Sequence, residues 1–269
     1  MILYSHSLQG FRDSNEDHHF HVLNLNNNNI NYNTINLLGV FDGHGGKTVS
    51  KFLKDNLSYF FLNKFKDTKK HLFNKPELVE KYVYKIFNLI QNKLIEDHPR
   101  VVHRCGSTAC MVIHHKDTSN KSKLWVINVG DSRAIKCNKF NIAEQLSQDH
   151  KPNSPEERMR IEQLGGRIDF DGSDWRIEGL SLSRAFGDLD CAPYVIHLPQ
   201  IYEYNIDNDR FIVLACDGLW DVLSNQDVVD YINTLLYNKE KHNLAKLLAE
   251  YAIKKGSMDN VTIIIYILH

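Results

Sequence analysis

The chain has 269 residues, 42% of them hydrophobic, and this length suits one large domain, which we expect to cover residues 1–269. The formal net charge is -1, from 32 basic and 33 acidic residues, so the bulk composition gives no reason to expect nucleic acid or an anionic membrane as a partner. Any recognition of phosphate groups must therefore be local.

Cysteine usage and the first residues bear on location. The five cysteines form no Cys-x-x-Cys pair and are odd in number, which favours reduced thiols over a disulfide framework or a zinc site. The first nine residues lack the basic and apolar segments of a signal peptide, and no apolar run is long enough to cross a bilayer. We expect a soluble protein of the cytoplasm or the nucleus.

A charged segment from Arg12 to Asp17 precedes a strand pattern, in which Phe20 and Val22 alternate with histidines. An arginine can grip a phosphate through two parallel hydrogen bonds, although Arg12 could instead pair with its own neighbouring acids. Because the chain starts close to this segment, we expect a short first strand. The asparagine-rich residues 24–33 predict a loop between two strands, and we assign them no function.

The apolar run from Leu37 to Phe41 ends in Asp42-Gly43-His44, followed by two more glycines. This pattern predicts a strand that delivers the Asp42 carboxylate to its tip. Gly43 has no Cβ, so its carbonyl can turn toward whatever Asp42 binds, and His44 can carry a proton near neutral pH. The three residues indicate a hard cation with proton chemistry beside it, with a glycine-rich strand-to-helix turn as the alternative.

Two helices and a hairpin are expected next. Apolar residues recur at helical spacing from Thr48 to Phe61, and Pro76 opens a second amphipathic helix; both need a sheet to cover. Ala109 to Ile113 and Leu124 to Val129 predict paired strands. The second of these strands is followed by Gly130-Asp131, again an acid near a strand tip, with a simple turn residue as the alternative.

The middle of the chain combines a helix with a segment of no clear periodicity. Ser154-Pro155-Glu156-Glu157 predicts a helix start with a capping box, and Gly165-Gly166 ends that helix. The polar segment from Arg167 to Glu178 is predicted to be a flap over a site. Arg184 then stands near Asp188, and we assign Arg184 to substrate binding, with an ordinary salt-bridged turn as the alternative.

The last part of the chain repeats the pattern of a strand that ends in an acid. Phe211 to Cys216 is a fully apolar strand, and Asp217-Gly218-Leu219-Trp220-Asp221 follows it. Two more helices are expected, one capped by Ser224 and one from about Leu244 to Lys255. Asp259 stands just before the strand Val261 to Leu268, so this acid precedes its strand.

These acids are expected to meet. In an antiparallel sheet the end of one strand lies beside the beginning of its neighbour. Because Asp42, Asp131 and Asp217 follow strands while Asp259 precedes one, all four can gather at one sheet edge. Carboxylates cannot crowd there without neutralisation, and an all-oxygen ligand set favours magnesium or manganese over zinc.

Two such ions about 4 Å apart, bridged by one carboxylate, would acidify a shared water and screen the charge of a phosphoester. The chemistry also needs an acid for the leaving oxygen, a cation for the phosphoryl oxygens and an open face, which His44, Arg12 and the flap can supply. The chain has no Gly-x4-Gly-Lys-Ser/Thr loop and no Cys-x5-Arg nucleophile, which argues against an NTPase or a cysteine phosphatase.

Together these motifs resemble the metal-dependent serine/threonine protein phosphatases of the 2C type, from Gly10 to about Ile267. Eight blocks stand in the order typical of that family: Asn15-Glu16-Asp17, Val40 to Gly46, Gly106 to Ala109, Asn128 to Arg133, Asp149-His150-Lys151-Pro152, Leu182 to Asp188, Ala215 to Asp221 and Asp259-Asn260-Val261-Thr262. One block would be weak support, but eight in order are highly specific.

The resemblance implies an α+β fold in which a central sandwich of two antiparallel β-sheets is flanked by α-helices on both sides. This four-layer αββα arrangement would hold a binuclear metal cleft at one sheet edge. Two Mg²⁺ or Mn²⁺ ions, with a weaker third, are the implied cofactors. Phosphorylated proteins are the implied partners, and we expect neither nucleic acid nor a membrane among them.

The resemblance also implies roles for single residues. Asp42 would bridge two ions, the Gly43 carbonyl would bind one of them, and Asp217 with Asp259 would hold the second. Glu16 would act mainly through coordinated water. The remaining roles fall to four residues: a weaker third metal at Asp131 and Asp221, substrate phosphate at Arg12, and protonation of the leaving oxygen by His44.

The expected function is that of a metal-dependent protein serine/threonine phosphatase, which hydrolyses phosphoserine and phosphothreonine by direct attack of a metal-bridging water. The alternative is a catalytically silent pseudophosphatase that acts as a binding or regulatory module. A missing ligand would support the alternative, and none is missing from the sequence. A metal hydrolase of small phosphoesters would share the chemistry, so only substrate profiling separates it from a protein phosphatase.

Overall fold

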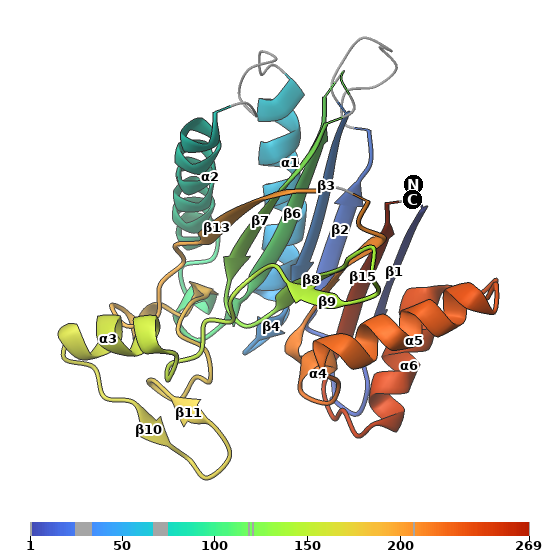
Figure 1. The fold of residues 1–269 in the computed structure, drawn as a ribbon. Helices are drawn as coiled ribbons and strands as arrows, with labels where there is room; N and C mark the ends of the chain where they lie inside the picture. The colour runs from blue at the N-terminus through green and yellow to red at the C-terminus, as the bar shows by residue number, and fades with distance from the viewer. Residues whose placement is uncertain are drawn as a thin grey trace.

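The computed structural model describes residues 2–24, 34–66, 75–117, 119, 121–206 and 208–268. Its centre is a pair of five-stranded antiparallel sheets (Figure 1). Sheet one has the order β1 (Ile2–Leu8), β15 (Val261–Ile267), β14 (Phe211–Ala215), β8 (Arg133–Cys137) and β9 (Ala143–Gln145). Sheet two has the order β13 (Gln200–Asn205), β7 (Ser122–Val129), β6 (Ala109–Lys116), β3 (Thr34–Phe41) and β2 (His18–Val22).

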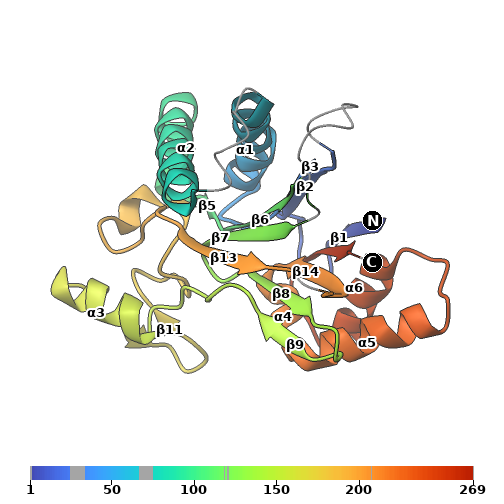
Figure 2. The same cartoon turned by 45° about the horizontal axis from the view of Figure 1, so that its top comes forward.

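Helices cover the outer face of each sheet. The pair α1 (Thr48–Lys66) and α2 (Pro76–Asp97) lies over sheet two, and the pair α5 (Asn225–Tyr237) and α6 (Leu244–Lys254) lies over sheet one. Figure 2 shows the resulting order of layers, helices, sheet two, sheet one and helices. The predicted α+β sandwich with four layers is therefore confirmed.

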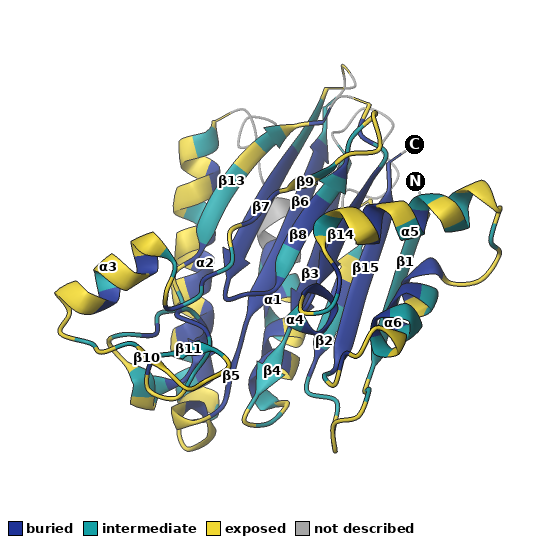
Figure 3. Cartoon of the chain, turned by 60° about the horizontal axis from the view of Figure 1, so that its bottom comes forward, coloured by how far each residue is buried: buried dark blue, intermediate teal, exposed yellow. Residues whose placement is uncertain are grey.

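The strands form this sandwich because their apolar side chains alternate between two cores. In β15, Ile263 and Ile265 pack into the core under α5 and α6, while Ile264 and Tyr266 pack between the sheets. Successive side chains of a strand point to opposite faces, so a strand that is apolar at every position must be covered on both sides. Each fully buried isoleucine stabilises the fold by about 1.5–3 kcal/mol. Figure 3 shows that the inner strands are buried along most of their length, whereas the edge strands β1 and β13 are only partly covered.

The helix starts follow the sequence with one exception. Ser224 caps α5 with a capping box, in which its side chain accepts from the Asp227 amide, as expected. Ser154 is the N-cap residue of α3 (Pro155–Gln163), but the predicted capping box there is wrong. Its hydroxyl donates to the Lys151 carbonyl at 2.8 Å, and a hydroxyl turned back along the chain no longer faces the free amides of the helix.

Short elements near one end of the sandwich complete the described fold. The predicted flap contains a hairpin that periodicity did not indicate, β10 (Asp169–Phe170) with β11 (Trp175–Arg176), and it extends away from the sheets beside α3 (Figure 1). A small sheet has the order β12 (Phe186–Gly187), β5 (Gly106–Ser107) and β4 (Gly43–His44). The helix α4 (Asp217–Trp220) follows β14.

Three further expectations concern the chain as a whole. The first strand is not short, because β1 has seven residues, each paired with β15. The asparagine-rich loop lies, apart from Asn24, outside the described residues. Within the described residues, no helix combines the length and the apolar character that a membrane span requires, and all five cysteines are free.

Candidate active site

Strand register brings the predicted acids to one end of the sandwich. Leu8 lies opposite Val261 in the β1–β15 pair, so the loop after β1 starts beside Asp259. His18 lies opposite Phe41 in the β2–β3 pair, so the segment before β2 runs next to Asp42. Asp42 and Asp131 follow strands of sheet two, whereas Asp217 and Asp259 flank strands of sheet one. The acids therefore meet between the ends of two sheets.

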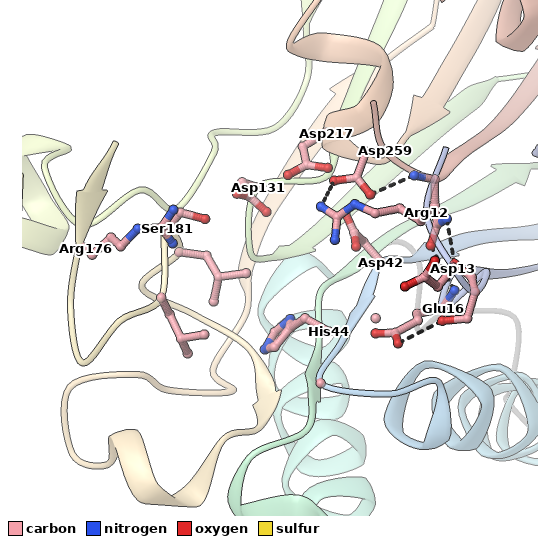
Figure 4. A pocket seen from close by; sticks show the side chains of 16 residues that line it. Arg12, Asp13, Glu16, Asp42, His44, Asp131, Arg176, Ser181, Asp217 and Asp259 are labelled. Carbon is pink, nitrogen blue, oxygen red and sulfur yellow. Dashed lines mark hydrogen bonds and ion pairs between the residues drawn. The ribbon is translucent and has the colours of Figure 1, made fainter. Parts of the chain in front are cut away.

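A cavity of about 460 Å³ opens at this end. Its lining includes six predicted metal ligands together with the predicted phosphate-binding and proton-donating residues (Figure 4): Glu16, Asp42, Gly43, Asp131, Asp217, Asp259, Arg12 and His44. The flap supplies Arg176 to the facing wall, and the residues just after the flap supply Leu180, Ser181 and Leu182. One cavity thus contains acids, a guanidinium and an imidazole from segments that are far apart in the sequence.

The electrostatics of this cavity disfavour bare carboxylates. Removal from water raises the pKa of Asp42 well above its usual range, and the charges of Asp217, Asp17 and Asp131 raise it further. The pKa of Asp217 is raised well above its usual range for the same reasons, burial first and then the charge of Asp131. Burial also raises the pKa of Asp17 to about 6. The pKa values of several neighbouring carboxyl groups are thus raised together, which indicates that a bound cation is needed to keep these groups ionised near neutral pH.

His44 is held by a carboxylate that the sequence analysis did not assign to the site. Its Nε2 donates to Oδ2 of the buried Asp188 at 2.6 Å. Burial by itself would lower the pKa of His44, but the bond to Asp188 and its charge outweigh burial, so the pKa is raised. His44 is therefore protonated at a higher pH than a free histidine, and Nδ1 remains as the nitrogen that can pass a proton to a bound group.

The loop after β1 positions Arg12 and Glu16 through Asn260. The Asn260 side chain donates to the Gln9 and Ser14 carbonyls at 2.7 and 3.0 Å, and it accepts from the Glu16 amide at 2.9 Å. Arg12 donates to Asp259 at 2.6 Å and is largely exposed. The Glu16 carboxylate accepts from the Gly46 amide at 2.9 Å. Asn260 thereby ties the loop to the start of β15.

Asp131 and Asp221, the two residues assigned to a third metal, lie in different settings. Asp131 is buried, lines the cavity and accepts from Lys151 Nζ at 2.5 Å. Asp221 ends α4, is exposed and does not line the cavity. Partial removal from water raises the pKa of the Asp221 carboxyl, and the negative charge of Asp131 raises it further.

The structure does not bring Arg184 to the cavity. Its guanidinium donates to buried Glu157 on α3 at 2.6 Å and to the Leu198 carbonyl at 2.9 Å, and little of its side chain is exposed. Because both terminal nitrogens already donate to these groups, the guanidinium cannot offer a substrate phosphate two parallel N–H donors. The assignment of Arg184 to substrate binding thus lacks support from its position, and the salt-bridged alternative describes its contacts.

The residues of the site that were not assigned from the sequence include Asp17, Lys151, Asp188 and Arg176. The first three stand inside motifs that the sequence analysis recognised, so their motif membership was the available signal. Arg176 lies in the flap, where the sequence lacks periodicity. Nothing in the local sequence distinguishes it from Arg167, which lies in the same flap but does not line the cavity.

The residues present fit a divalent cation. Asp17 is buried and its Oδ2 has no hydrogen-bond partner among the described residues. Ligand atoms of Asp17, Asp42 and Cys216 lie within 4.8 Å of one another. The cavity itself offers carboxylate oxygens and the Gly43 carbonyl, which suit magnesium or manganese. A cation here would offset the repulsion that raises the pKa values of Asp42 and Asp217.

Known proteins are similar to this chain in sequence and in fold. The family model for protein phosphatase 2C matches residues 3–261. A PP2C-like domain-containing protein, R307, of Acanthamoeba polyphaga mimivirus is 41% identical over 171 residues, which cover 55% of this chain and 95% of that protein. Probable protein phosphatase 2C 59 of Oryza sativa subsp. japonica is 38% identical over 234 residues, which cover 86% of this chain and 66% of the relative.

Among solved structures, a serine-threonine phosphatase 2C from Toxoplasma gondii is similar with a TM-score of 0.82. It is 23% identical and the match covers 98% of this chain and 94% of that chain, which supports the fold. The chain spans about two thirds of the length of the rice relative and 64% of probable protein phosphatase 2C 11 of Arabidopsis thaliana. The chain belongs to the protein phosphatase 2C family.

Proposed function

We propose that this chain is an active protein serine/threonine phosphatase that hydrolyses phosphoserine and phosphothreonine with the help of two divalent cations, magnesium or manganese, and a weaker third. The observation that carries the proposal is the convergence of Arg12, His44 and the acids Glu16, Asp42, Asp131, Asp217 and Asp259 on one cavity. A chain that had lost turnover would be free to lose any of these side chains.

The residues divide the reaction among them. Arg12 lies at the cavity mouth, and one of its nitrogens pairs with Asp259, which leaves further donors for the phosphoryl oxygens. Water attacks phosphorus in line with the serine or threonine oxygen, so one P–O bond forms while the other breaks. His44, held by Asp188, supplies the proton that the leaving oxygen takes. The products are inorganic phosphate and a free hydroxyl group.

Asp42, the Gly43 carbonyl, Asp217, Asp259 and Glu16 would hold the two principal cations, and Asp131 with Asp221 the third. Bound divalent cations supply an acidified water and neutralise the charge of the phosphate. The protein contributes the fixed arrangement of these ligands, because each stands at the end of a paired strand or in a loop tied to one.

One assay tests the proposal directly. Hydrolysis of an aryl phosphate and of a phosphothreonine peptide would be measured with manganese, with magnesium and with a chelator. We expect activity on both substrates that the chelator abolishes. Asp217→Asn keeps the shape of the side chain but removes one charge from the ligand set, so it should lower kcat/KM at least about a hundredfold.

The matched control is Asp227→Asn, which changes an exposed acid on α5 that does not line the cavity. This variant should retain the wild-type rate. Activity that survives both the chelator and Asp217→Asn would contradict the proposal. Metal uptake without hydrolysis of either substrate would instead favour a binding module.

A further inference from the structure

The flap presents one arginine to the cavity that the proposed chemistry does not require. Arg176 on β11 lines the cavity on the flap side, and Arg12 lies across the acids from it (Figure 4). These two are the only arginines among the described residues of the lining. Arg12 suffices to bind the phosphate that is cleaved, so Arg176 is available for another group.

The direction of Arg176 follows from its neighbour. Trp175 packs against Phe170 with ring centroids 5.3 Å apart, and the guanidinium of Arg158 on α3 lies 5.6 Å from the Trp175 ring. These contacts anchor one face of β11 to its own hairpin and to α3. Because successive residues of a strand point to opposite faces, Arg176 points away from these contacts and toward the cavity.

The Arg176 side chain is held in place before any substrate arrives. Its Nε pairs with Asp171, and its Nη1 donates to the Gly179 carbonyl at 3.0 Å. Asp171 also accepts from the Ser173 amide, the Ser173 hydroxyl and the Asp174 amide, each at 2.8 Å. Nη2 is the one nitrogen of the guanidinium that has no hydrogen-bond partner among the described residues. A fixed guanidinium loses little freedom when it binds an anion.

We propose that Arg176 forms a subsite for an anionic group of the substrate, next to the phosphoserine or phosphothreonine that is cleaved. When the phosphorylated side chain enters the cavity, neighbouring residues of the polypeptide must pass its mouth, where the flap forms one wall. A carboxylate or a second phosphate there could accept from Nη2, whereas a neutral or basic side chain could not pair with the charge. The inference rests on the proposed function and adds a preference for acidic sequences.

The test uses phosphothreonine peptides that differ at one flanking position. Glu, Gln, Lys or phosphoserine would be placed in turn at each of the two positions before and after the phosphothreonine, and kcat/KM would be measured with saturating manganese. For at least one position, the wild-type chain should prefer Glu over Gln roughly three- to tenfold, since the pair is partly exposed. The phosphoserine peptide shows whether the subsite favours a phosphate over a carboxylate.

Arg176→Gln should bring the ratio of the Glu to the Gln peptide close to one. Arg176→Glu should reverse the preference toward the Lys peptide, a change that partial unfolding would not produce. The matched control is Arg167→Gln, because Arg167 lies in the same flap, pairs with Asp169 at 2.7 Å and does not line the cavity. This control should keep the wild-type ratio. Added salt should bring the wild-type ratio of kcat/KM for the Glu and Gln peptides closer to one, because salt screens the interaction between the charges.

Two outcomes would overturn the inference. A wild-type chain that treats Glu, Gln and Lys peptides alike has no such subsite, and an Arg176→Gln variant that loses the same factor on every peptide shows only a structural role. Both outcomes leave the proposed function intact, because the peptides are still hydrolysed. If the wild-type chain hydrolyses neither the peptides nor an aryl phosphate, it is the proposed function that fails.

Discussion

His44 in β4 and Asp188, which follows β12, can form a hydrogen bond because the strand between β4 and β12 has a glycine, Gly106, at that point. The small sheet places Gly106 opposite His44 in β4 and opposite Gly187 in β12. A Cβ at Gly106 would overlap the Asp188 carboxylate and stand 2.5 Å from His44 Nε2. Only a residue without a side chain leaves room for this hydrogen bond. The pair therefore depends on the Gly-Ser-Thr motif as much as on its own residues.

The first prediction at the residue scale concerns pH. The Asp188 carboxylate raises the pKa of His44, so Asp188→Asn should lower that pKa. A general acid must be protonated to act, and the fall in kcat toward alkaline pH should therefore begin about one pH unit lower in the variant. The measurement is the pH dependence of kcat on a phosphothreonine peptide, whose alkoxide leaving group needs a proton.

An aryl phosphate provides the control for this experiment, because a nitrophenolate leaves without protonation. Its alkaline limb should stay in place in Asp188→Asn. A shift of the same size on both substrates would show that Asp188 acts on something other than proton donation by His44.

At the scale of single elements, two helix starts that look alike in the sequence differ in the structure. Ser224 Oγ accepts from the Asp227 amide at 3.2 Å and thus satisfies a free amide of α5, whereas Ser154 Oγ turns back to the Lys151 carbonyl. Ser224→Ala should therefore lower the free energy of unfolding by about 1 kcal/mol, and Ser154→Ala by less. Urea unfolding of the two variants measures the difference. A larger loss for Ser154→Ala would contradict the assigned caps.

The flap and α3 share a small core of their own. Ile161, Ile177, Leu182, Ala185 and Val195 pack together, apart from the three cores of the sandwich. Because this cluster is separate from those cores, we expect changes on the flap surface to alter the cavity wall without disturbing the ends of the strands that carry the metal ligands. Because the two parts have separate cores, we assign the preference for residues that flank the phosphorylated residue to the flap, and cleavage of the P–O bond to the sandwich.

For the molecule as a whole, the acid cluster links stability to pH and to metal. A carboxyl whose pKa is raised on folding binds more protons in the folded state, so its contribution to the unfolding free energy falls as pH rises through the shifted range. For Asp17 that range runs from about 4 to about 6. Metal-free protein should lose stability across it, and magnesium or manganese should restore stability increasingly as pH rises, because the cations bind deprotonated carboxylates.

Thermal unfolding at about pH 5 and about pH 7.5, with and without magnesium, tests this linkage. The rise in Tm on adding magnesium should be larger at the higher pH. Asp17→Asn is the matched variant, since it keeps the shape and removes the titration, and it should flatten the pH dependence of the metal-free protein. A rise in Tm that is the same at both pH values would rule out the linkage.

Much of the fold could be predicted from the sequence because the signals are local. Apolar runs such as Leu37 to Phe41 indicate a strand, and the acid that follows marks the strand end, so Asp42, Asp217 and Asp259 were placed at strand tips without coordinates. Ser224 and Pro76 likewise marked helix starts correctly. Each of these signals depends on a few neighbouring residues, whose effect on the backbone is largely independent of the rest of the chain.

What the sequence determined by itself was therefore the set of chemical groups, the strands and helices that carry them, and the family to which they belong. The tertiary structure decided which partners each group meets. It directed Arg184 to Glu157 rather than to the cavity, placed Arg176 in the cavity wall, and gave His44 its carboxylate across 144 positions of chain. Such pairings depend on strand register and on the packing of distant segments, which no local pattern of residues encodes.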